Sequence, residues 1–163
     1  IINKEPEYDD YGIGDFSKCR KINVYSLSSL NYSLLGIFFI HHPIPNKYFQ
    51  SQMPLFYFIQ GIVSYLSDSK YCTVPHWSHR VDYSLATYNT ITGILVGLIC
   101  YRLYYSYWII GAGLLCRKIG SQYRKKSNVG KYMFFHTLWH YSLPCCAGWT
   151  VYNNRPLMDK IKN

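Results

Sequence analysis

The stretch FFHTLWHY, residues 134–141, lies inside an apolar run that covers residues 129–152. If this run is helical, His136 and His140 project from the same face, one turn apart. Two imidazoles in this arrangement supply half of a typical zinc site. Zinc proteases with this spacing carry a glutamate directly after the first histidine as general base, whereas Thr137 stands there in this chain. That class of protease is therefore excluded, and the alternative to a metal site is a hydrogen-bonded histidine pair inside a helix bundle.

The composition points to a helical membrane protein. Of 163 residues, 49% are hydrophobic and 15% are charged, and the charged share is well below the quarter or so that is usual for a soluble domain. The 18 Tyr and 4 Trp fit a chain that lies near a bilayer boundary, where amphipathic rings are favoured. The length allows one domain. No soluble domain with a basic, aromatic face can be discerned, so nucleic-acid binding is not predicted.

Apolar segments and polar ends divide the chain. The pattern predicts an all-α fold, an integral membrane helix bundle of about five transmembrane segments within residues 22–152. A polar N-terminal arm (1–21) precedes the bundle and a polar C-terminal tail (153–163) follows it. The expected membrane segments are residues 22–42, 48–67, 81–101, 103–116 and 129–152.

Residues 117–131 are rich in Lys and Arg and read as a loop. Positive loops stay on the side from which a chain inserts, and they attract anionic lipid. With this loop inside, the segment directions bring Asp68, Asp82 and His136 to the same depth. A carboxylate inside a membrane is by default a candidate for a functional site. The candidate metal ligands are therefore His136, His140, Asp82 and Asp68.

Six cysteines are present, and none forms a C-x-x-C pair. Most lie in apolar segments, where a free thiol behaves as a small hydrophobic group. The spacing predicts neither a disulfide framework nor a cysteine-type zinc site. The chain begins with Ile1 and not with Met, as a processed form or a fragment would. A removed transit peptide would leave such a start, and no secretory signal is discernible.

The H-x-x-W-H run, with an aspartate at the start of an earlier helix, resembles the CREST superfamily of membrane proteins, which includes alkaline ceramidases and the progestin and adiponectin receptors. The matching positions are Ser64, Asp82, His136 and His140, and the chain departs from the family at Asp68, where the family has His. The resemblance implies a zinc site near one membrane face and hydrolysis of lipid amides. Two of the family's seven helices have no counterpart here, and the resemblance covers about half of the chain.

The departure at Asp68 bears on the ligand set. Zinc accepts a carboxylate oxygen, so Asp68 could replace the missing histidine. His76 and His79 in the adjoining loop are further candidates. If the protein is a hydrolase, Ser64 would support the ligands or the oxyanion. A shortened bundle with an altered ligand is more easily explained as a relative without catalytic activity.

Three functions remain open from the sequence. The first is a structural or accessory subunit of a larger membrane complex, such as a respiratory or ATP synthase assembly, with other membrane subunits as partners. Its location would be the mitochondrial inner membrane first and an endomembrane second. The second is a zinc-dependent lipid amidase of the ceramidase kind. The third is a membrane anchor that binds haem or quinone through His136 or His140.

Overall fold

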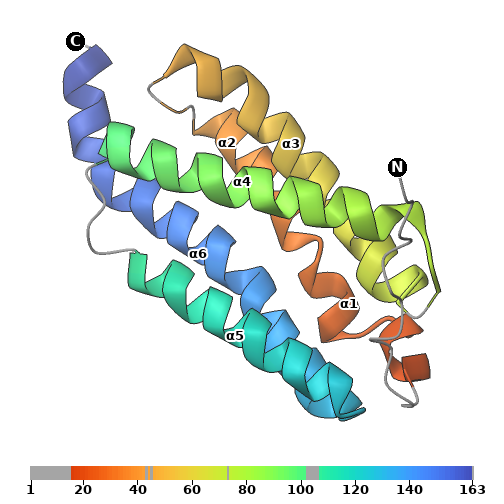
Figure 1. Ribbon diagram of the computed structural model, residues 1–163. Coiled ribbons are helices and arrows are strands. Elements are labelled where there is room, and N and C mark those ends of the chain that lie inside the picture. Colours follow the sequence, from red (N-terminus) through yellow and green to blue (C-terminus); the bar gives the residue numbers. More distant parts are fainter. Residues whose placement is uncertain (1–15, 43, 45, 73, 102–106, 163) are drawn as a thin grey trace, which may run out of the picture.

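The computed structural model describes residues 16–42, 44, 46–72, 74–101 and 107–162, and within these residues every regular element is a helix (Figure 1). The predicted N-terminal arm falls largely on residues 1–15, and part of the fourth predicted segment falls on residues 102–106; both lie outside the described residues. In chain order the elements are the 3₁₀-helix η2 (Phe16–Arg20), α1 (Val24–Ser28), α2 (Asn31–His41), α3 (Lys47–Tyr65), the π-helix η3 (Leu66–Lys70), α4 (Trp77–Tyr101), α5 (Tyr107–Lys125) and α6 (Val129–Lys162).

The helices pack side by side in two pairs with α4 between them (Figure 1). Helix α2 lies along α3, α5 lies along α6, and α4 contacts both α3 and α6. One buried apolar cluster joins α2, α3, α4, α5 and α6; its larger members are Tyr32, Leu35, Phe39, Met53, Tyr57, Trp139 and Leu143. Buried polar groups of α3 and α6, among them Gln60, Ser64 and His140, adjoin this core.

The predicted integral membrane bundle of about five transmembrane segments is wrong. Crossing a bilayer takes about 20 mostly apolar residues, and among the helices of the described residues none combines that length with that apolar character. Helix α2 has only 11 residues, and the first predicted segment, 22–42, is divided between α1 and α2. The same finding overturns the predicted location in the mitochondrial inner membrane or an endomembrane.

The basic stretch is helical over much of its length. Helix α5 extends to Lys125, so Arg117, Lys118 and Arg124 lie on a helix and not in the predicted 117–131 loop. Only a short turn remains before α6, with Ser127 at φ 56° and the Asn128 side chain accepting a hydrogen bond from the Lys131 amide at 3.2 Å. Lys and Arg are good helix formers, so a run of basic charge did not require a loop.

Helix α3 is held close to α2 by two glycines. A Cβ on Gly36 would lie 2.5 Å from the Pro54 carbonyl oxygen of α3, and one on Gly61 would lie 2.5 Å from the Ser33 amide nitrogen of α2. The Ser33 hydroxyl also donates to the Phe58 carbonyl at 2.8 Å. This close approach fixes the rotation of α3, and thereby the direction of the polar residues at its C-terminal end.

Candidate metal centre

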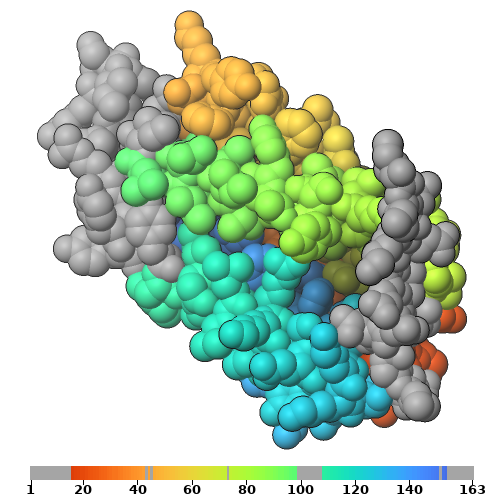
Figure 2. Space-filling view, in the orientation of Figure 1, coloured from red at the N-terminus to blue at the C-terminus, as the bar shows by residue number. Residues whose placement is uncertain are grey.

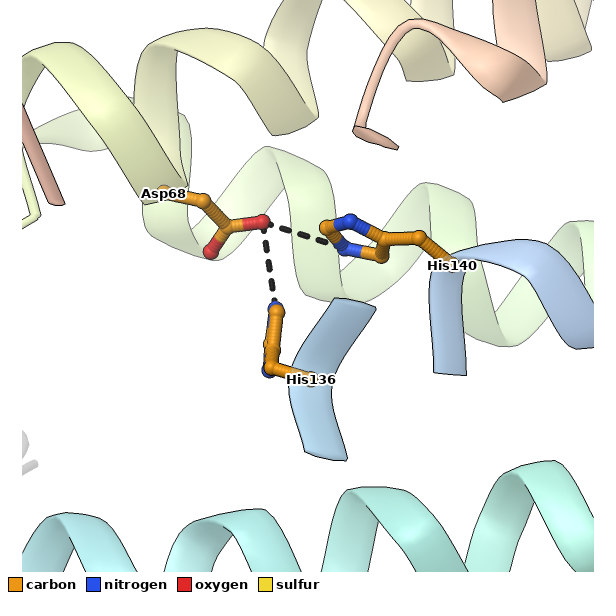
Figure 3. A group of neighbouring side chains, drawn as sticks. All are labelled: Asp68, His136 and His140. Atoms are coloured by element: carbon orange, nitrogen blue, oxygen red, sulfur yellow. Dashed lines mark hydrogen bonds and ion pairs between the residues drawn. The ribbon is translucent and has the colours of Figure 1, made fainter. Parts of the chain in front are cut away.

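Asp68, His136 and His140 converge on one point (Figure 3). Asp68 comes from η3, and the two histidines come from successive turns of α6, as their four-residue spacing predicts. The Nε2 atoms of His136 and His140 each lie 3.2 Å from Oδ2 of Asp68. Each of the three residues offers one ligand atom, and these three atoms all lie within 4.8 Å of one another.

A π-helical turn carries Asp68. Helix α3 continues without a break into η3, where the amide of Tyr71 donates to the carbonyl of Leu66 at 2.9 Å. Single π turns at the end of an α-helix often occur at functional sites, because the wider turn changes the direction of its side chains. The Ser64 hydroxyl, one turn earlier, donates to Oδ2 of Asp68 at 3.2 Å, which helps to hold the carboxylate toward α6.

Serine hydroxyls from the α1 region orient His140. The Ser28 hydroxyl donates to the carbonyl of Tyr25 at 2.6 Å and lies 2.9 Å from Nδ1 of His140. Since the single proton of Ser28 is directed at that carbonyl, its oxygen accepts from Nδ1–H of the histidine. In the neutral ring this leaves a lone pair on Nε2, which faces Asp68.

His140 is only 2% exposed. Burial and the neighbouring His136 ring lower the pKa of His140, so the neutral ring is the favoured form near pH 7. A neutral Nε2 and a carboxylate oxygen are both acceptors, and two acceptors at 3.2 Å repel each other unless a proton or a cation lies between them. The chemistry of this donor set therefore fits a bound cation.

Asp68 remains ionised in this setting. Its burial favours the protonated acid, but the charge and the hydrogen bond of the neighbouring His136 outweigh burial and lower the pKa of Asp68. An ionised carboxylate that is 8% exposed requires compensation by positive charge. A cation held among the three side chains would provide it.

A second carboxylate, Asp82, lies near the first but outside the group of three. Its Oδ1 accepts a hydrogen bond from Nε2 of Gln60 at 2.8 Å. Burial and the charge of Asp68 raise the pKa of Asp82 to about 7. Asp82 therefore exchanges a proton near neutral pH, which is the property of a general acid or base.

A cavity of about 280 Å³ opens beside these groups. In Figure 2 the surface is hollowed between α4 and α5, with atoms of α6 at the bottom of the hollow. Arg117 of α5 reaches the cavity and places its guanidinium over the rings of Tyr83 and Trp139. The lining combines the two carboxylates and the histidine pair with Tyr32, Gln60, Ser64, His79, Tyr83, Arg117, Arg124 and Trp139.

The structure thus brings together three of the four predicted metal ligands and places Asp82 next to them. The further candidates His76 and His79 are not part of the group of three: the His76 ring stacks on Tyr71, and His79, which lines the cavity, bonds to the Ser67 hydroxyl at 2.7 Å and to the Tyr71 carbonyl at 2.9 Å. Haem or quinone binding, and binding of anionic lipid by residues 117–131, stay predictions.

Sequence reasoning missed several groups of the site. Gln60 carried a readable signal, because it precedes Ser64 and Asp68 by four and eight residues and so lies on the same helical face. No sequence pattern marks Ser28 or Arg117. Ser28 reaches His140, and Arg117 reaches the cavity, only because α1 and α5 pack against α6.

Comparisons with known proteins gave no match, whether to family models, to curated proteins or to solved structures. The resemblance to the CREST superfamily stays a prediction that rests on the matching residues, and the site is interpreted below from its own chemistry.

Proposed function

We propose that this protein is a zinc-dependent hydrolase that cleaves an amide bond, with Asp68, His136 and His140 as the metal ligands. The observation that carries the proposal is the convergence of three acceptor atoms, one carboxylate oxygen and two imidazole nitrogens, beside a cavity of about 280 Å³. The resemblance to ceramidases suggests the amide class of substrate.

The donor set suits zinc. Ligand atoms at about 2.0–2.1 Å from a tetrahedral zinc ion lie about 3.3 Å from one another, and the two Oδ2–Nε2 distances here are 3.2 Å. Two histidines and one carboxylate make three protein ligands, the number typical of catalytic zinc, whose fourth position takes water or substrate. When bound, zinc would make a water molecule acidic and polarise a carbonyl oxygen.

The neighbouring side chains can supply the proton transfers. Asp82, with a pKa raised to about 7 by burial and by Asp68, is suited to accept a proton from water and to return it to a leaving amine. Gln60 donates to one Asp82 oxygen at 2.8 Å and fixes the direction of that carboxyl group. The Ser64 hydroxyl donates to Oδ2 of Asp68 at 3.2 Å and also lies near enough to Asp82 to influence its pKa.

Tyr32 is suited to stabilise an oxyanion. Its ring packs against His140 with the centroids 5.7 Å apart, and it lines the cavity. The side chain is 2% exposed, yet its hydroxyl has no hydrogen-bond partner among the described residues. Burial and the charge of Asp82 raise the pKa of Tyr32, so the hydroxyl keeps its proton and can donate it to a reacting oxygen.

Metal analysis tests the proposal. The purified chain, loaded with zinc and dialysed, should retain about one zinc ion per chain, and His140→Ala should retain none. His76→Ala is the matched control, because His76 stacks on Tyr71 away from the cluster, and it should bind zinc as the wild type does. Equal zinc retention by all three proteins, or none by the wild type, would contradict the metal site.

Activity is measured separately on the zinc-loaded protein. N-acyl amides are offered as substrates, and release of the free amine is followed. A chain that binds one zinc ion through His140 but hydrolyses none of these amides would keep the metal centre and refute the amidase.

A further inference from the structure

Two cysteines that are far apart in the sequence lie in one small buried cluster. Cys19 lies on η2 and Cys72 follows η3, and the two side chains are 0% and 2% exposed. Each thiol is the neighbour that shifts the pKa of the other most, which places the two side by side. Both belong to a buried cluster with Phe16, Tyr25 and Tyr132, which is separate from the main apolar core.

We propose that Cys19 and Cys72 are a dithiol site that oxidises reversibly to a disulfide, joining η2 to the segment that carries Asp68. This inference does not depend on the proposed hydrolase or on bound metal. It concerns thiols that the hydrolytic chemistry does not use.

The surroundings make the two thiols unequal. The neighbouring Cys19 thiol and the charge of Arg124 lower the pKa of Cys72 against the effect of burial. The Arg124 guanidinium also donates to the Cys72 carbonyl at 3.1 Å. The Cys72 thiol and burial raise the pKa of Cys19. Cys72 is therefore the attacking thiolate, and Cys19 is the resolving thiol.

The oxidant is a small disulfide such as oxidised glutathione, which accepts the two electrons that the thiols lose. The Cys72 thiolate attacks one glutathione sulfur, so a mixed disulfide forms and one glutathione leaves as thiolate. That thiolate takes the Cys19 proton, and the Cys19 sulfur then attacks Cys72 and displaces the second glutathione. Two protein thiols are oxidised by two electrons, and one glutathione disulfide is reduced to two thiols.

Access to the buried pair comes through η2. This element is a 3₁₀-helix of five residues, and such short pieces have poorer hydrogen-bond geometry than α-helices and belong to the part of a fold that opens locally at low cost. In contrast to this buried pair, Cys145 is exposed and Cys116 is half-buried.

The test maps disulfides in the full chain. The reduced protein is equilibrated with oxidised glutathione, its remaining thiols are alkylated in acid-quenched samples, and it is digested with chymotrypsin without reductant. The expected product joins residues 17–25 to residues 72–77, with a mass two hydrogens below the sum of the two peptides. It should exceed every other cross-linked cysteine pair at least about tenfold and disappear on reduction.

Two variants and one control sharpen the result. Cys19→Ser and Cys72→Ser should each abolish the linked peptide, whereas Cys145→Ser should leave it unchanged. The proposal is overturned if Cys19 and Cys72 of the wild type are both recovered as alkylated thiols under conditions that convert the exposed Cys145 to its glutathione adduct. A Cys72–glutathione adduct that never resolves onto Cys19 overturns it as well.

Discussion

Asp68 and Asp82 are two carboxylates beside one cavity, and their surroundings shift them in opposite directions. Asp68 faces two imidazoles of α6, which lower its pKa despite burial. Asp82 faces amide and hydroxyl groups of α3 and the negative charge of Asp68, and its pKa rises to about 7. Identical side chains at similar depth thus differ because one lies against potential positive charge and the other lies against negative charge.

This difference separates two tasks that hydrolysis needs. A metal ligand must stay ionised, and a general base must exchange its proton near the working pH. Pairs of titratable groups whose environments separate their pKa values are typical of acid–base catalysis. The predictions that follow test the separation, starting with the change that should have the largest effect.

Asp68→Asn should have the largest effect. The amide keeps the shape of the side chain but removes the charge, so zinc affinity should fall by at least about 100-fold, more than loss of an outer hydrogen-bond partner usually costs. Hydrolysis should fall to background. Asp82→Asn is the matched control: it should lower hydrolysis but change zinc affinity by less than about tenfold. Titration with a competing chelator measures both affinities. Equal losses of zinc affinity in the two variants would show that Asp68 and Asp82 do not differ in their contribution to metal binding.

Tyr32→Phe should have the second-largest effect, a loss of hydrolysis. Tyr32 is buried and feels the charge of both Asp82 and Asp68, and loss of a single oxyanion donor typically lowers kcat by about 100- to 1000-fold. Zinc content should stay at the wild-type level, because the hydroxyl is not a ligand. Steady-state kinetics of the zinc-loaded variant are the measurement. A variant with wild-type kcat would remove Tyr32 from the reaction.

Ser28→Ala should lower zinc affinity indirectly, through the orientation of His140. Ser28 accepts from Nδ1 of His140, and partners that orient a ligand histidine are typically worth about 10- to 100-fold in metal affinity. Ser51→Ala, at an exposed position on α3, is the control and should bind zinc normally. Calorimetric titration with zinc compares the two. Equal affinities would show that Ser28 does not hold His140 in its binding tautomer.

The pH dependence of stability should show the smallest effect. The pKa of Asp82 is about 7 in the folded chain and about 3.9 in an unfolded one, so between these values the folded state binds a proton that the unfolded state has released. The stabilisation is full below about pH 4 and is lost as pH rises to 7, by at most about 1.4 kcal/mol per pH unit.

Urea unfolding of metal-free protein measures this contribution of Asp82 to the free energy of unfolding. The wild-type free energy of unfolding, minus that of Asp82→Asn, should decrease between pH 4.5 and pH 7, and the subtraction removes most of the contributions of Asp68 and His140. Asp68 acts in the opposite sense, since its lowered pKa gives stability that is lost only as pH falls below about 4. A difference that is flat or that rises with pH would contradict the pKa assigned to Asp82.

Much of the candidate site could be predicted from local spacing. His136 and His140 lie one turn apart, and Asp68 follows Ser64 by four residues on a continuous helix. The proposal that Asp68 takes the place of a histidine ligand agrees with its position between the two rings. The membrane prediction was wrong because a high share of apolar and aromatic residues does not by itself indicate lipid: a helix bundle with a buried aromatic core shows a similar composition.

The Cys19–Cys72 pair was out of reach of the same reasoning. Its members are separated by more than fifty positions, and no local motif marks either one. The earlier expectation that the cysteines form no disulfide framework followed from spacing, and spacing carries no information on contacts between distant segments.

The sequence alone determined the helical character of the chain, the i, i+4 histidine pair and the polar face that ends in Asp68, because helical periodicity acts over a few residues. The tertiary structure decided the rest. Contact between η3 and α6 joins Asp68 to the histidines, α1 brings Ser28 to His140, and burial together with neighbouring charge sets the opposite shifts of the two carboxylates. Burial and electrostatics depend on which segments lie side by side, and no local pattern specifies that.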